Sequence, residues 1–201
     1  MGLEDSLRSG RWRHICVDMQ NMFFRKTPWH APWLARILPT VQRLVSAQPE
    51  KTVFTRFIPP NDVEDASGAW RDYYRHWNQM TRSRLGEEML DIVDDLKVFI
   101  PPAQVIDKRG YSPWHEGKLQ KHLEGQDIET LVMTGGETDV CVLATLLGAL
   151  DYDYRAVLIT DGVYSSIDST HDQLLGFYRL RFTNQITTWT AEEFSSHLQK
   201  T

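Results

Sequence analysis

The sequence has little cysteine, no excess of positive charge and no long apolar run. Its two cysteines, Cys16 and Cys141, are too few for a secreted disulfide framework, so we expect a reducing, cytoplasmic setting. The formal net charge of −5 argues against a dedicated nucleic-acid-binding protein, which usually carries a basic excess. No apolar stretch reaches the ~18 residues that a membrane-spanning helix requires, and no signal-peptide core is visible. We therefore expect neither nucleic acid nor membrane among its partners.

The remaining composition is that of an ordinary globular protein. Hydrophobic residues make up 41% and charged residues 24% of the 201 residues. This length is sufficient for one substantial core and short for two. Because no internal repeat or linker-like tract interrupts the chain, we expect a single domain over residues 1–201.

Short apolar runs alternate with longer stretches of helical periodicity along the chain. The expected strands are residues 14–18, 52–57, 104–107, 130–134, 156–160 and 185–189. The expected helices are residues 33–47, 69–85, 113–123, 140–150, 169–180 and 191–198. Strands that alternate with helices indicate parallel βαβ units, so the pattern predicts an α/β fold of three layers. In such sheets the active site forms beyond the carboxyl ends of the strands.

The strongest local signal is the segment 134–141, which reads TGGETDVC. It follows an expected strand, and its two glycines permit an unusual backbone path into a helix that Asp139 can cap. Cys141 then lies in the first helical turn, where free amides and the helix dipole lower the pKa of a thiol. The same amides can bind an oxyanion. We expect Cys141 to be a nucleophile; a buried structural cysteine is the alternative.

Two charged residues also stand at strand ends. Asp18 ends the first expected strand, and Lys108 follows the expected strand 104–107. A carboxylate, an ammonium and the thiol of Cys141 at three strand ends can form one cluster. Lys108 would stabilise the thiolate, and Asp18 would carry the proton to a leaving nitrogen. For either residue alone, a surface strand end is the alternative.

Three motifs, in this order, resemble those of the isochorismatase-like cysteine hydrolases. This superfamily includes nicotinamidases, N-carbamoylsarcosine amidohydrolases, and amidases that cleave biuret or ureides. The motifs are DMQNMF at residues 18–23, VIDKRGYS at 105–112 and GETDVCV at 136–142, and the next strand ends in TDG at 160–162. The resemblance extends from Ile15 to about Phe194.

The resemblance implies a doubly wound, mostly parallel sheet of six strands and a catalytic triad of Asp18, Lys108 and Cys141. It also implies a cis peptide before Glu137, which turns the amides of Glu137 and Cys141 toward the substrate oxygen. Cys141 would attack, ammonia or an amine would leave, and a thioester-type intermediate would be hydrolysed. Relatives that cleave a vinyl ether often lack the cysteine, so Cys141 favours amide chemistry. Because relatives commonly form dimers or tetramers, we expect a homo-oligomer.

The sequence departs from the family pattern at several positions. Met22 stands where many members carry a second aspartate, and Trp114 and Gly117 replace a frequent phenylalanine and threonine. More importantly, no aspartate-x-histidine group with a second histidine follows Phe57, although a catalytic metal would need such ligands. We therefore expect neither a metal nor another cofactor.

The candidate substrate-binding residues follow strand ends or lie in the aromatic helix 69–85; they are Gln20, Phe23, Arg56, Trp77 and Tyr111. Arg56 can hold an anionic substrate group, with a surface ion pair as the alternative. Gln20 can orient Asp18 or donate to the substrate. Phe23 can form a wall of the pocket or simply pack. The helix that contains Trp77 either covers the pocket or contacts a second subunit.

We expect a cysteine-dependent hydrolase that cleaves the C–N bond of a small carboxamide, ureide or carbamoyl compound. Three alternatives stay open: a non-catalytic binding protein on this fold, a vinyl-ether hydrolase, and a nicotinamidase. The complete triad argues against the first, Cys141 against the second, and the missing metal ligands against the third.

Overall fold

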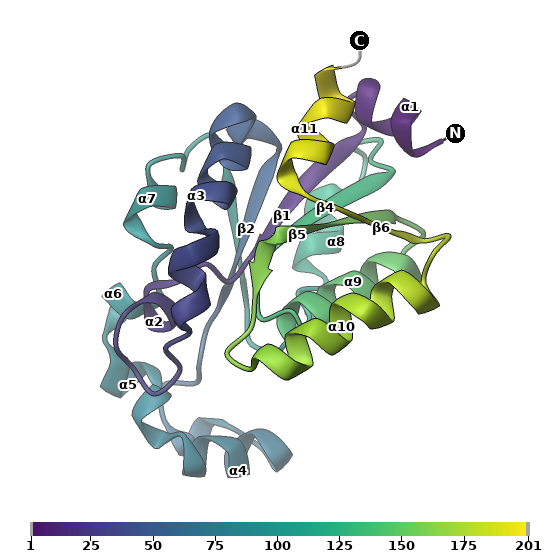
Figure 1. Cartoon of the computed structure of the whole chain (residues 1–201). Helices are drawn as coiled ribbons and strands as arrows, with labels where there is room; N and C mark the ends of the chain where they lie inside the picture. Colours follow the sequence, from purple (N-terminus) through teal and green to yellow (C-terminus); the bar gives the residue numbers. More distant parts are fainter. Residues whose placement is uncertain (1, 200–201) are drawn as a thin grey trace.

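A sheet of six strands forms the centre of the structure, a computed structural model that describes residues 2–199 (Figure 1). The strands are β1 (Trp12–Val17), β2 (Thr52–Phe57), β3 (Gln104–Lys108), β4 (Thr130–Gly136), β5 (Arg155–Tyr164) and β6 (Ile186–Trp189). Their order is β3-β2-β1-β4-β5-β6, and every neighbouring pair is parallel. The expected three-layer, doubly wound α/β fold is confirmed.

The strand order reverses next to β1. From β1 the chain adds β2 and β3 on one side, and then returns to add β4, β5 and β6 on the other. The connections after β1 and β4 therefore leave toward opposite faces of the sheet. A crevice opens between their carboxyl ends, and this is where doubly wound proteins bind ligands.

Helices cover both faces of the sheet (Figure 1). One face carries α8 (Lys118–Leu123), α9 (Cys141–Asp151) and α10 (Asp168–Arg181); the other carries α1 (Leu3–Arg8), α3 (Pro32–Ala47), α7 (Asp94–Lys97) and α11 (Ala191–Gln199). In β1, Ile15 and Val17 pack toward α9, whereas Cys16 packs toward α3, as the alternation of a strand requires. Among the described helices the longest, α3, has 16 residues, and none is long and apolar enough to span a membrane.

The connection between β2 and β3, residues 58–103, differs from the expectation of one long helix. It contains α4 (Gly68–His76), a 3₁₀ turn (Asn78–Met80), α5 (Arg82–Leu85), α6 (Glu87–Leu90) and α7. The helix stops at Trp77, where φ is −100° and ψ is 43°. Figure 1 shows α4 projecting away from the sheet, near the side where α2 (Asn21–Phe24) follows β1.

The helix expected over residues 113–123 begins later than predicted, at Lys118. Gly117 precedes it with a left-handed backbone, φ 67°, a conformation that glycine adopts without steric cost. The remaining expected helices are present with their ends shifted by one or two residues.

Candidate active site

Three side chains from three strand ends converge below the crevice. Asp18 directly follows β1, Lys108 is the last residue of β3, and Cys141 is the first residue of α9. The Lys108 Nζ lies 2.7 Å from Asp18 Oδ2 and donates a hydrogen bond to Cys141 Sγ at 3.4 Å. The side chains of Lys108 and Asp18 are each 1% exposed. The structure thus brings together the three residues that the sequence suggested.

Asp18 is held in place by the neighbouring strand. Its backbone amide donates to the Thr55 carbonyl at 3.2 Å, and the Thr55 hydroxyl donates to Asp18 Oδ1 at 2.6 Å. Asp18 has a left-handed backbone, φ 49°, which aspartate and asparagine tolerate better than most residues. Thr55 was not among the residues predicted from the sequence, although its place near the end of the expected strand 52–57 indicates a position close to Asp18.

The pKa of Cys141 in this cluster differs from the expectation. Burial raises the pKa of the Cys141 thiol, and although Lys108 opposes this shift, the nearby Asp18 adds to it. The predicted lowering of the Cys141 pKa is therefore wrong for the resting protein. Burial also acts against the Lys108 ammonium, but the attraction of Asp18 and Cys141 outweighs it and raises the pKa of Lys108. At rest, a buried ammonium–carboxylate pair lies beside a protonated thiol.

The turn before Cys141 requires its two glycines. A Cβ on Gly135, which has a φ of 96°, would lie 2.0 Å from the Val17 carbonyl oxygen, and one on Gly136 would lie 2.3 Å from the ring of Tyr164. The peptide between Gly136 and Glu137 is cis, as the resemblance implied. Among the described residues, the amides of Glu137 and Cys141 donate no hydrogen bond to the protein, so both are free to bind a substrate oxygen.

Asp139 does not cap α9 as expected. The residue that precedes the helix is Val140, and no side chain bonds to the helix amides there. The carboxylate of Asp139 instead accepts hydrogen bonds from the hydroxyls of Ser165, at 2.8 Å, and Thr170. It thereby ties the Cys141 turn to the start of α10.

A cavity of about 340 Å³ opens above Cys141. It is lined by Phe23, Pro28, Trp29, His30, Phe57, Tyr73, Trp77, Tyr111, Gly136, Glu137, Val140, Cys141 and Ser166. Three of the expected substrate-binding residues, Phe23, Trp77 and Tyr111, therefore line this cavity. The contribution of Tyr73 and Trp77 also shows that the α4 segment covers the cavity within one chain.

The sequence matches the family model of the isochorismatase domain over residues 14–190. The chain belongs to the isochorismatase family.

Solved structures share the isochorismatase fold at low sequence identity. A cysteine hydrolase from Pseudomonas syringae pv. phaseolicola is 21% identical with a TM-score of 0.80, over 96% of this chain and 93% of that one. N-carbamoylsarcosine amidase from Thermoplasma acidophilum is 20% identical with a TM-score of 0.72, over 90% and 97%. Pyrazinamidase of Pyrococcus horikoshii, solved in complex with zinc, is 23% identical with a TM-score of 0.69, over 90% and 99%. No curated protein matches the chain.

Two expected substrate contacts of this isochorismatase-family chain need correction. The buried Gln20 side chain donates to the carbonyls of Phe57, at 3.1 Å, and Leu90, at 2.7 Å, and accepts from the Phe57 amide. Arg56 pairs with Asp107 at 2.7 Å and Asp91 at 3.2 Å. Neither side chain lines the cavity above Cys141.

The alternation of side chains along β2 explains why Arg56 does not reach the cavity. Thr55 and Phe57 point toward the cluster and the cavity, so Arg56, which lies between them, points the other way. Gln20 lies after β1, where its amide holds the end of β2 against the segment around Leu90. It positions the backbone near Asp18 and has no free group for a substrate.

The cavity does not offer the ligands of a metal site. Among residues 2–199, no group of three or more His, Cys, Asp or Glu side chains could hold a metal ion. In the described cavity lining, His30 is the only histidine and Glu137 the only carboxylate. A histidine–carboxylate set of the kind that binds zinc or iron therefore does not form in this isochorismatase-family pocket.

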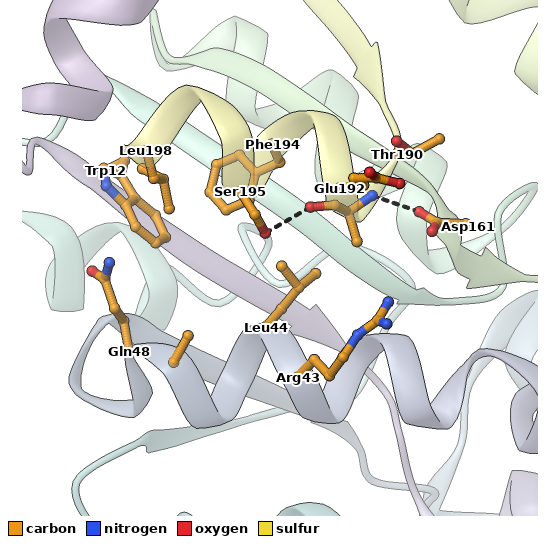
Figure 2. Close-up of a pocket in the computed structure, with 12 residues that line it drawn as sticks. Trp12, Arg43, Leu44, Gln48, Asp161, Thr190, Glu192, Phe194, Ser195 and Leu198 are labelled. Carbon is orange, nitrogen blue, oxygen red and sulfur yellow. Dashed lines mark hydrogen bonds between the residues drawn. The ribbon is translucent and has the colours of Figure 1, made fainter. Parts of the chain in front are cut away.

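A second hollow, of about 460 Å³, lies between α3 and α11, on the face of the sheet that these two helices cover (Figure 2). Trp12, Leu44 and Phe194 contribute its apolar lining. Asp161, which follows the expected strand 156–160, accepts a hydrogen bond here from the Ala191 amide at 2.8 Å, at the start of α11. Among the described residues, Asp18, Lys108 and Cys141 do not line this hollow.

Proposed function

We propose that this protein is a cysteine-dependent amidohydrolase that cleaves the C–N bond of a small carboxamide, ureide or carbamoyl compound. The observation that carries the proposal is the position of Lys108 Nζ, 2.7 Å from Asp18 and 3.4 Å from Cys141, directly below a cavity. A buried charge pair adds little to stability once the desolvation of both charges is counted, so its position beside a thiol supports a role in activating that thiol.

The first half-reaction uses the three side chains in order. As Cys141 Sγ attacks the substrate carbonyl carbon, its proton passes to Asp18, and the Lys108 ammonium stabilises the forming thiolate. The carbonyl oxygen becomes an oxyanion and accepts hydrogen bonds from the amides of Glu137 and Cys141. Asp18 then returns the proton to the nitrogen, the C–N bond breaks, and ammonia or an amine leaves an acyl-thioester on Cys141.

The second half-reaction regenerates the enzyme. Water attacks the thioester carbonyl while Asp18 accepts one of its protons, and the same two amides bind the second oxyanion. The C–S bond breaks, and the Cys141 sulfur receives the proton from Asp18. The products are one acid and one free thiol. Because burial raises the pKa of the Cys141 thiol at rest, the transfer of its proton to Asp18 accompanies the attack on the substrate.

Ammonia release from a panel of substrates tests this function. The panel contains carbamoyl amino acids, biuret-like ureides, simple carboxamides and nicotinamide, with isochorismate as the control that has no amide. Cys141→Ala should abolish turnover. Cys16→Ala is the matched control and should retain it, because Cys16 is fully buried in β1 and burial raises its pKa to about 12. Full activity in Cys141→Ala, or cleavage of isochorismate alone, contradicts the proposal.

A further inference from the structure

Aromatic rings form most of the wall of the cavity above Cys141. They belong to Phe23, Trp29, Phe57, Tyr73, Trp77 and Tyr111. Trp29 is central to this wall, because its ring centroid lies 5.8 Å from that of Tyr73, 6.0 Å from Phe57 and 6.4 Å from Trp77. The faces of aromatic rings attract cations through their negative π-electron density, so the rings that border the cavity can bind an ammonium or a flat cationic ring within it.

The same wall contains one carboxylate. Glu137 lines the cavity, and its Oε1 accepts a hydrogen bond from the Ser166 amide at 2.8 Å, which fixes the side chain. Burial raises the pKa of Tyr73 and of Tyr111, and the negative charge of Glu137 adds to both shifts. The field of this carboxylate therefore reaches the aromatic wall.

Apart from His30, no basic side chain lines the described cavity beside Glu137. Among the described residues that line the cavity, none is arginine or lysine. Lys108 lies beneath it, where its Nζ contacts Asp18 at 2.7 Å, Cys141 at 3.4 Å and the Gly110 carbonyl at 3.1 Å. The charges of Lys108 and Asp18 cancel, so Glu137 leaves the site with one net negative charge. An anionic substrate would lose its hydration there without gaining a cationic partner.

We propose that this pocket selects a positively charged substrate, a small flat carboxamide or ureide that carries a quaternary or protonated nitrogen. The inference rests on the proposed function only in placing the scissile carbonyl at Cys141. The cation lies in the cavity against the aromatic wall, with the Glu137 carboxylate, which lines the same cavity, as its counter-ion. Hydrolysis then creates a carboxylate next to Glu137, and the repulsion between the two favours product release.

A set of three benzamides that differ only in charge tests this selection. Benzamide is neutral, 3-(trimethylammonio)benzamide is a cation, and 3-carbamoylbenzoate is an anion. Their binding to the Cys141→Ala protein is measured by tryptophan fluorescence and calorimetry at about pH 8, where an ordinary histidine is neutral. The cation should bind about tenfold or more tightly than benzamide, and the anion more weakly than benzamide.

A variant of the counter-ion tests the role of Glu137. Glu137→Gln, made in the same protein, should lower the ratio of cation to benzamide affinity by about threefold or more, because glutamine still accepts from Ser166 but has no charge. Glu124→Gln is the control and should leave the ratio unchanged, since Glu124 is exposed after α8 and outside the cavity. An anion that binds as well as the cation, a cation that does not bind, or an unchanged ratio in Glu137→Gln would overturn the inference.

Turnover by the wild-type protein separates this inference from the function on which it rests. A charge preference in binding without hydrolysis of any amide supports the selective pocket and contradicts the amidohydrolase. Turnover confined to anionic carbamoyl amino acids contradicts the selective pocket and supports the amidohydrolase.

Discussion

Breaking the ion pair between Asp18 and Lys108 should destabilise the protein more than removing both charges. The two variants are Asp18→Asn and Lys108→Met. Asparagine suits the left-handed backbone at residue 18, and its side-chain oxygen can still accept from Thr55, so the charge is the main change. Methionine keeps most of the length of the lysine side chain and removes the ammonium.

The magnitude follows from burial. Both side chains are 1% exposed, so each single variant leaves the opposite charge desolvated and unpaired. Such a loss costs about 3–5 kcal/mol, whereas replacing both partners of a buried pair is often close to neutral. The double variant should therefore be more stable than either single variant. The partly exposed pair of Arg56 and Asp107 is the control, because a pair near the surface contributes only about 0–1 kcal/mol.

The pH dependence of the free energy of unfolding gives a second readout. In the wild type, Asp18 and Cys141 raise the pKa of Lys108 above its ordinary value of 10.5. The stabilisation of the fold by the charged Lys108 is therefore complete below pH 10.5 and is lost as the pH rises through the pKa of the folded state. In Asp18→Asn, burial is no longer outweighed and lowers the pKa of Lys108. That variant should gain stability as the pH rises from neutral toward 10.5, whereas the wild type should not.

Urea denaturation at neutral and alkaline pH measures both effects, and ammonia release measures the chemistry. All three variants should lose about 10²-fold or more in turnover. Free-energy changes that simply add in the double variant would refute the ion-pair reasoning. Wild-type turnover in either single variant would refute the triad.

Three further predictions address the corrected substrate contacts, the metal and the buried histidine. Arg56→Ala should change the KM for small amides by less than about twofold in steady-state assays, because Arg56 is paired with Asp91 and Asp107. A large rise in KM would instead show that Arg56 contacts the substrate. Exhaustive chelation with elemental analysis should leave turnover intact, and activity that returns only with added zinc, iron or manganese would show otherwise. Burial lowers the pKa of His14 from 6.5 to about 3, so its contribution to stability is complete above pH 6.5 and is lost as the pH falls toward 3. Over this pH range the free energy of unfolding from urea denaturation should fall by about 1.4 kcal/mol per pH unit, and His14→Gln should reduce this pH dependence.

Most of the sheet could be predicted because its strands are short apolar runs that end in polar residues. The exception is β5, expected over residues 156–160 and observed from Arg155 to Tyr164. The polar residues and glycine at 160–162 interrupt the apolar pattern, but the strand continues because its register against β4 shifts and Val163 and Tyr164 pair with Gly135 and Gly136. This pairing depends on a strand distant in sequence, which a local pattern cannot show.

The cluster of Asp18, Lys108 and Cys141 could be predicted from the same pattern as the sheet. Asp18 and Lys108 stand at strand ends and Cys141 begins the helix after β4, and parallel strands bring these positions to one edge. The contacts of Gln20 and Arg56 could not be predicted from the sequence, because their partners come from the segment around residues 90–91 and from a neighbouring strand. The direction of the pKa shift of Cys141 also required the fold, since burial is a property of the folded chain alone.

The triad and the wall of the pocket come from separate parts of the chain. Asp18 and Lys108 stand at the ends of β1 and β3, and Cys141 begins α9. Tyr73 comes from α4 and Trp77 directly follows it, within the long connection between β2 and β3. Gln20 fastens that connection at Leu90, away from α4. For directed evolution, a mutational library restricted to residues 68–77 therefore varies one part of the cavity wall and leaves Asp18, Lys108 and Cys141 unchanged.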